Sequence, residues 1–96
     1  MITYKIKHHI PGNITIEVPI LKSLALSDLM QISKQFYSSL PEGIKSINLN
    51  PFTKNLKITY EYEKIDIFQY LNEMASNIEL QKLIESRDKK NIKNPY

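Results

Sequence analysis

Residues 2–18 read ITYKIKHHIPGNITIEV, and apolar side chains recur at every second position of most of this stretch. A period of two is typical of a β-strand with one buried face, because successive side chains of a strand point to opposite sides. The residues of the apolar parity are Ile2, Tyr4, Ile6, Ile10, Ile14, Ile16 and Val18. Lysines, threonines, an asparagine and a glutamate occupy the other parity. The stretch therefore predicts β-structure that buries one face and exposes the other.

Pro11 and Gly12 interrupt this alternation. A two-residue loop at these positions would place Ile6 opposite Glu17 and would mix the buried and exposed faces. A three-residue loop over residues 11–13 keeps the faces consistent, and so does one long strand that is kinked at Pro11 and Gly12. We favour the kinked strand, with Pro11 at an edge or a bulge, because proline has no N–H to donate.

An amphipathic helix is expected next. It begins with Ser23 or Ser27 as the N-cap and ends before Pro41 and Gly43. The apolar residues of its core-facing stripe are Leu26, Leu29, Met30, Ile32, Phe36 and Leu40.

Two strands and a second helix follow. Alternation predicts strands over residues 44–49 and 56–62, joined by a polar turn as an antiparallel hairpin. The second helix begins near Asp66, a good N-cap residue. Asn77 either caps a fresh helical segment or lies within one continuous helix. From Ser86 onward we expect no regular structure.

The order strand, helix, strand, strand, helix predicts an α+β fold. Two amphipathic helices that cover one face of an antiparallel sheet form a two-layer sandwich. The predicted elements (βαββα) are five of the six that make up the ferredoxin-like, split βαβ arrangement. The missing element is a closing fourth strand, and its only place is after residue 84, where the sequence is polar. We therefore expect one edge of the sheet to be open.

The chain has 96 residues, a formal net charge of +3 and no cysteine. This length predicts one domain, and the lack of cysteine excludes a disulfide scaffold, a thiol nucleophile and a thiolate metal site. Residues 1–84 hold nine lysines and eight acidic residues, whereas residues 85–96 hold four basic and two acidic residues. We expect a nearly neutral domain over residues 1–84, followed by a basic, flexible tail over residues 85–96.

Three strings resemble heavy-metal-associated (HMA-like) domains, which accompany bacterial metal-transporting P-type ATPases. Residues 7–19, KHHIPGNITIEVP, resemble the opening of these domains, which they match at His8, Ile10, Pro11 and Gly12. Residues 40–47, LPEGIKSI, resemble their Leu-Pro-Gly-Val junction with Glu42 as one extra residue, and residues 48–58, NLNPFTKNLKI, resemble their Asn-Pro-x-Thr hairpin. The resemblance covers residues 3–84 and implies a ferredoxin-like fold in a metal-handling system.

The chain departs from this family where the metal is usually bound. The best-known members bind copper(I) or zinc through Cys-x-x-Cys in the loop before the first helix, whereas residues 19–27, PILKSLALS, hold no ligand. Soft-metal transport by that route is excluded, because thiolates supply the affinity. The arginines that the family carries after Pro-Gly are replaced here by Asn13 and Thr15.

His8 and His9 are the candidate metal ligands. Adjacent residues of a strand point to opposite faces, so a shared ion would need a third ligand such as Glu17. Imidazole and carboxylate ligands favour iron, nickel or zinc over copper(I). We expect any such binding to be weak and expect no resident cofactor.

The polar face of the predicted sheet is the candidate binding surface. Its residues are Lys5, Lys7, Asn13, Thr15, Glu17, Lys57, Thr59 and Glu61. Tyr4, Tyr60 and Tyr62 would offer an RNA-stacking platform if they faced solvent. The Lys/Arg-Gly-aromatic signature of RNA-recognition motifs is absent from residues 55–60, so we expect these tyrosines to pack in the core.

The sequence predicts a binding protein rather than an enzyme. The carboxylates Glu61, Glu63 and Asp66 have no evident nucleophile or base beside them, and a glycine-rich phosphate loop is absent. We expect an accessory or adaptor protein of a metal transport or storage system, with iron as the first candidate. Its partners would be a metal-transporting P-type ATPase or other HMA-like domains, or a second copy of itself bound through the open sheet edge.

Two alternative functions remain at this point. The chain would be a metal carrier if His8 and His9 bound an ion, or an RNA-binding module of the same topology, although nucleic acid is the less expected partner. No window approaches the ~18 apolar residues of a membrane span, and no apolar leader is visible. We therefore expect a cytoplasmic protein that a partner could recruit to a membrane or compartment.

Overall fold

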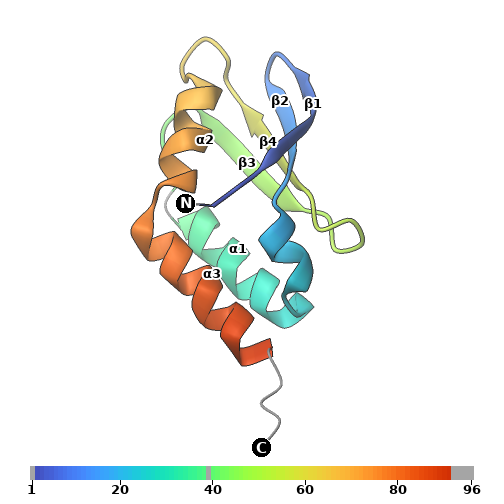
Figure 1. Ribbon diagram of the computed structural model, residues 1–96. Coiled ribbons are helices and arrows are strands. Elements are labelled where there is room, and N and C mark those ends of the chain that lie inside the picture. The colour runs from blue at the N-terminus through green and yellow to red at the C-terminus, as the bar shows by residue number, and fades with distance from the viewer. Residues whose placement is uncertain (1, 39, 92–96) are drawn as a thin grey trace, which may run out of the picture.

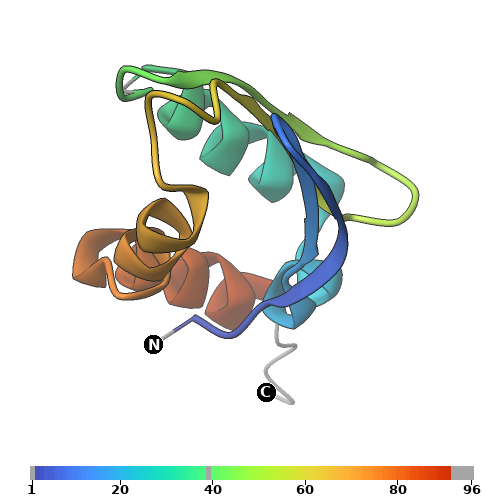
Figure 2. The same ribbon diagram turned by 90° about the horizontal axis from the view of Figure 1, so that it is seen from above.

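The computed structural model describes residues 2–38 and 40–91 and shows the predicted α+β fold. Its elements are β1 (Lys5–Ile10), β2 (Asn13–Glu17), the 3-10 helix η1 (Pro19–Ser23), α1 (Leu26–Ser38), β3 (Ile44–Leu49), β4 (Leu56–Tyr60), α2 (Ile67–Ala75) and α3 (Ile78–Asn91). The strands form one antiparallel sheet in the order β1-β2-β4-β3 (Figure 1). The helices all lie on one side of this sheet, which curves around them in Figure 2.

The first alternating stretch forms a β-hairpin, so the predicted single kinked strand is wrong. β1 and β2 are joined by a two-residue loop of Pro11 and Gly12, and Ile10 lies opposite Asn13. Proline holds φ near −65° and Gly12 has a φ of +88°, which is the combination of a type II turn. The carbonyl oxygen of Gly12 accepts a hydrogen bond of 2.9 Å from the backbone N–H of Tyr60, which ties the turn to β4.

A β-bulge at Lys7 reconciles this short loop with the alternation of the sequence. With regular pairing, a two-residue loop would set Ile6 opposite Glu17. The register of the hairpin shifts by one residue between Ile6 and His8, so Ile6 lies opposite Ile16 instead. A bulge places an extra residue on one strand of an antiparallel pair. Here that extra residue brings Ile6 onto the face of Ile16. Ile10, between the bulge and the turn, lies opposite Asn13 on the side away from the helices and is 49% exposed, so its predicted place on the buried face is wrong.

β1 occupies the position that the missing fourth strand would take. It runs antiparallel to β2, and β2 runs antiparallel to β4, so β1 is parallel to β4 with β2 between them. In the split βαβ arrangement, the strand that follows the second helix takes this place. A strand that comes earlier in the chain therefore closes the sandwich, and the sheet ends at the outer sides of β1 and β3.

Polar caps define where the last two helices begin. The Asp66 carboxylate accepts hydrogen bonds from the backbone N–H groups of Phe68 and Gln69 at 3.1 and 3.2 Å, as its prediction as an N-cap requires. The Asn77 side-chain oxygen accepts from the N–H of Leu80 at 2.9 Å. Asn77 therefore caps a fresh helix, which settles one of the alternatives that the sequence left open.

α3 continues through residues for which no regular structure was expected. The sequence predicts no regular structure from Ser86 onward, whereas α3 continues to Asn91. Within it, Arg87 lies 3.5 Å from Asp28 of α1, and both side chains are mostly buried. This ion pair joins α3 to α1 and gives the end of α3 a structural role. Residues 92–96 lie outside the described residues.

The core-facing stripe of α1 is narrower than predicted. Leu29 and Ile32 are buried, but Leu26 and Met30 are 48% and 56% exposed. The side chain of Phe36 lies outside the described part of the structure. α1 packs against the edge strand β3, so only the row of side chains that faces the sheet is covered.

Replacing Gly12 by alanine should lower the free energy of unfolding by about 1–2 kcal/mol, because L-residues are strained at positive φ. The new Cβ would also lie 3.3 Å from the carbonyl oxygen of Tyr60. Urea unfolding followed by circular dichroism measures this change. The control, Pro11→Ala, should cost less than about 1 kcal/mol, because alanine can adopt the same φ. Equal losses in both variants would contradict the turn geometry.

Candidate functional site

The uncovered face of the sheet brings together most of the predicted binding surface. Residues directly opposite each other in an antiparallel pair share a face. Three such pairs lie here: Lys5 with Glu17, Thr15 with Lys57, and Asn13 with Thr59. Two predicted members lie elsewhere. Lys7 forms the bulge, and Glu61 lies in the turn after β4, where it pairs with Lys64 at 3.1 Å.

Glu17 is the one acidic side chain on the described strands, and it is already engaged. The Nζ atom of Lys22 donates a hydrogen bond to Glu17 Oε2 at 2.7 Å. This bond lowers the pKa of Glu17, and the charges of Lys7 and Lys5 add to the effect. Lys22 neutralises the charge of Glu17. Lys5 and Lys57 therefore leave the uncovered face positively charged, and Lys7 adds a positive charge on β1.

β1 presents an edge without a neighbouring strand. Within residues 2–38 and 40–91 it pairs only with β2, so backbone N–H and C=O groups on its other side are left for an added strand. All six of its residues are exposed. The strand carries Lys5 and Lys7 and no acidic residue. Lysines and bulges are devices by which native edge strands avoid indiscriminate pairing.

α2 runs alongside this edge. The backbone N–H of Ile2 donates to the carbonyl oxygen of Ala75 at 2.8 Å, and the hydroxyl of Tyr4 donates to Asn72 Oδ1 at 3.0 Å. Further along β1, the His9 ring meets the ring of Phe68 edge to face, with centroids 5.2 Å apart. Residues 2–9 therefore follow α2 in the antiparallel sense, from its last residues to its first turn.

The two predicted metal ligands point to opposite faces of β1. His8 lies opposite Thr15 on the uncovered face, whereas His9 lies opposite Ile14 on the helix side. There the Nε2 atom of His9 shares a hydrogen bond of 2.7 Å with the hydroxyl of Tyr60. Among the described residues, no group of three or more His, Cys, Asp or Glu side chains is placed to hold a metal ion.

The tyrosines do not form a stacking platform on the uncovered face. Tyr60 is 5% exposed and belongs to the core, and Tyr4 packs against the core on the helix side. Tyr62 lies after the end of β4 and is 62% exposed, so both the predicted strand end at residue 62 and the predicted core position of Tyr62 are wrong. On the described strands, the side chains that face away from the helices include no phenylalanine or tyrosine.

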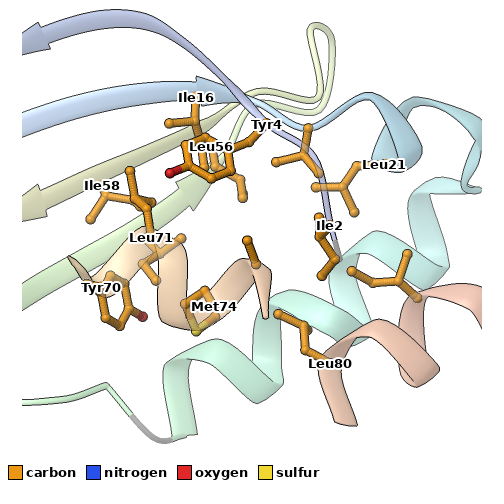
Figure 3. A pocket seen from close by; sticks show the side chains of 14 residues that line it. Ile2, Tyr4, Ile16, Leu21, Leu56, Ile58, Tyr70, Leu71, Met74 and Leu80 are labelled. Carbon is orange, nitrogen blue, oxygen red and sulfur yellow. The ribbon is translucent and has the colours of Figure 1, made fainter. Parts of the chain in front are cut away.

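An apolar pocket lies on the helix side, between the sheet and α2 (Figure 3). Its volume is about 60 Å³, and its lining is almost entirely apolar. The deep part of the lining is buried and includes Ile16, Leu56 and Ile58. The partly exposed lining residues mark its mouth, and they are Ile2, Tyr4, Tyr70, Met74 and Leu80.

Tyr70 gives this mouth a hydroxyl group in an apolar setting. Burial raises the pKa of Tyr70, because the phenolate form would lose hydration. The sequence offered one sign of the pocket: Ile2 and Tyr4 share the parity of the buried isoleucines. The pocket itself arises from how residues 2–4 and α2 pack together, which the sequence pattern does not contain.

Comparison of the chain with protein-family models, with curated proteins and with solved structures gives no match. Among the helices of the described residues, none combines the length and the apolar character needed to cross a membrane.

Replacing Glu17 by glutamine should reduce the loss of stability at low pH. The pKa of Glu17 is lowered in the folded chain. The ionised carboxylate therefore stabilises the fold at pH values above its ordinary pKa of 4.5, and this contribution disappears as the pH falls through the lowered pKa. Thermal melting of both proteins at neutral pH and below 4.5 measures the difference. Lys22→Gln should have the same effect, whereas Glu42→Gln, at an exposed turn position, should not. Identical acid sensitivity of Glu17→Gln and the wild type would contradict the role of this ion pair.

Proposed function

We propose that this chain is a non-enzymatic protein-binding module that accepts an acidic, extended segment of a partner protein as an additional strand on β1. The observation that carries the proposal is the exposed six-residue edge of β1, with no strand on its outer side among the described residues. In strand addition, main-chain hydrogen bonds supply affinity and the side chains on alternate positions supply specificity.

The charge of the edge favours an acidic partner. Lys5 and Lys7 lie on β1, and Lys57 lies on the same uncovered face as Lys5. Glu17 cannot balance them, because Lys22 already binds its carboxylate. Carboxylates on an added strand would find these cations at close range, and charge complementarity of this kind selects partners and accelerates their association.

The same charges argue against pairing between two copies of the chain. Consider two copies of β1 paired antiparallel, in the register that sets helix-side residues opposite helix-side residues. In this register Lys7 of each copy would lie opposite His8 of the other. Four lysines would then share one short strand pair without a carboxylate on either strand. No lysine lies directly opposite another in this register, but four cations on one short strand pair repel each other through space. We therefore expect the isolated protein to be a monomer and the partner to be a different chain.

The resemblance to HMA-like domains supplies the candidate partner. In this proposal the module is an adaptor of a metal transport or storage system, with iron as the first candidate, and its partner is a metal-transporting P-type ATPase or a related domain. An edge that binds a strand suits an adaptor, because it needs no bound metal. His8 and His9 do not favour the alternative of a metal carrier, since they point to opposite faces.

The proposal can be tested with a synthetic peptide in which Glu and Val alternate over the length of β1. We expect it to bind the wild type, and we expect Lys5→Glu combined with Lys7→Glu to weaken binding about tenfold, because two attractive surface pairs of up to about 1 kcal/mol each are lost. Isothermal titration at low salt measures the affinity, and added salt should weaken it. Hydrogen exchange should show slower exchange of β1 amides in the complex.

A matched charge reversal separates edge binding from general charge attraction. Two lysines outside the sheet, Lys34 on α1 and Lys82 on α3, are exposed, so Lys34→Glu combined with Lys82→Glu changes the net charge equally. This variant should bind the peptide nearly as well as the wild type. Absence of peptide binding to the wild type, or equal losses in the two double variants, would refute the proposal. A dimer of the wild type in light scattering would refute the argument against self-pairing.

A further inference from the structure

We infer that the apolar pocket behind β1 receives one aliphatic side chain of the partner strand. This inference rests on the proposed function and makes it more specific, because it adds an anchor residue to the acidic segment. The pocket adjoins the segment that leads into β1. Ile2 and Tyr4, at the mouth of the pocket, directly precede β1 in the chain, and the other side of the mouth is formed by Tyr70 and Met74 of α2 (Figure 3).

The direction of the anchor follows from the geometry of strands. Tyr4 packs against the core on the helix side, as Ile16 does. Residues directly opposite each other on neighbouring strands point to the same face. A partner residue opposite Tyr4 would therefore direct its side chain toward the helix side, where the mouth of the pocket lies. The residues on either side of it would point to the uncovered face, where Lys5 lies opposite Glu17.

The size and polarity of the pocket define the anchor. A volume of about 60 Å³ is less than half of the roughly 150 Å³ of an apolar cavity that holds benzene. The space therefore fits the tip of a valine, leucine or isoleucine side chain and is too small for an aromatic ring. A charged or amide side chain would lose its hydration without gaining partners, because nearly all of the lining is apolar.

The partner chemistry is thus an acidic strand with one aliphatic anchor. Two features of the mouth suit the entry of a side chain. Ile2 and Tyr4 are held to α2 by single hydrogen bonds of 2.8 and 3.0 Å to Ala75 and Asn72, and Met74 is an unbranched side chain that can adjust its shape around an anchor.

The test uses two peptides that differ at one position. Both alternate Glu and Val along β1 and extend past Tyr4, with either leucine or alanine opposite Tyr4. We expect the leucine peptide to bind the wild type about tenfold more tightly than the alanine peptide, since burying a leucine side chain is worth enough for at least this ratio. Isothermal titration measures both affinities. Equal affinities would overturn the inference.

A variant that fills the pocket gives the matched control. Ala75 is 5% exposed and lines the pocket, whereas Ala25 lies exposed before α1. Ala75→Val should reduce the affinity of the leucine peptide to that of the alanine peptide and leave the alanine peptide unchanged. Ala25→Val should change neither affinity. Circular dichroism and thermal melting establish that each variant is folded before binding is measured.

A second variant covers the case in which Ala75→Val does not fold. Met74→Ala enlarges the pocket, so the variant should accept a peptide with phenylalanine at the anchor position at least tenfold better than the wild type does. No gain for this peptide would overturn the inference. The two proposals fail in different ways. If neither peptide binds, the proposed function fails; if both bind equally and depend on Lys5 and Lys7, only the anchor fails.

Discussion

The bulge at Lys7 is the constraint on which the sheet depends. The pairing register set by the tight turn at Pro11 and Gly12 differs by one residue from the register that pairs Ile6 with Ile16. The bulge supplies the extra residue that allows both registers in one hairpin. Beyond it, Ile6 returns to the side of the sheet that faces the helices. Residues 2–4 can then continue along α2 and cover part of the core. Without the extra residue, this segment would present its apolar side chains to solvent.

Local chemistry made much of the architecture predictable. Alternation located the strand over residues 44–49 at its observed bounds and the start of β4 at Leu56. Asp66 marked the beginning of α2 because its side chain satisfies N–H groups that a helix leaves free. The polar parity also placed Thr15 and Lys57 on one surface, since strand geometry forces alternate side chains to the same face.

Features that depend on long-range packing were not predictable from the same patterns. With uninterrupted pairing, a two-residue loop would mix the two faces of the hairpin, and only the bulge at Lys7 makes this short loop possible. The closing strand precedes the rest of the sheet in the chain and does not follow residue 84, because spatial order need not follow chain order. The exposure of Met30 depends on how little of α1 the sheet covers. The pocket forms where residues 2–4 pack against α2, and no local sequence pattern indicates this contact between distant segments.

The position of the closing strand in the chain also affects how the protein folds. β1 pairs with its immediate neighbour through a two-residue loop, whereas a strand after α2 would have to find β2 across most of the chain. Closing a long loop costs more conformational entropy than closing a short one, and folding slows as contacts become less local. One side of the sheet can therefore form as a local hairpin, which β4 then stabilises by pairing with β2. The pairing of β1 with β2 therefore needs no contact with the helices.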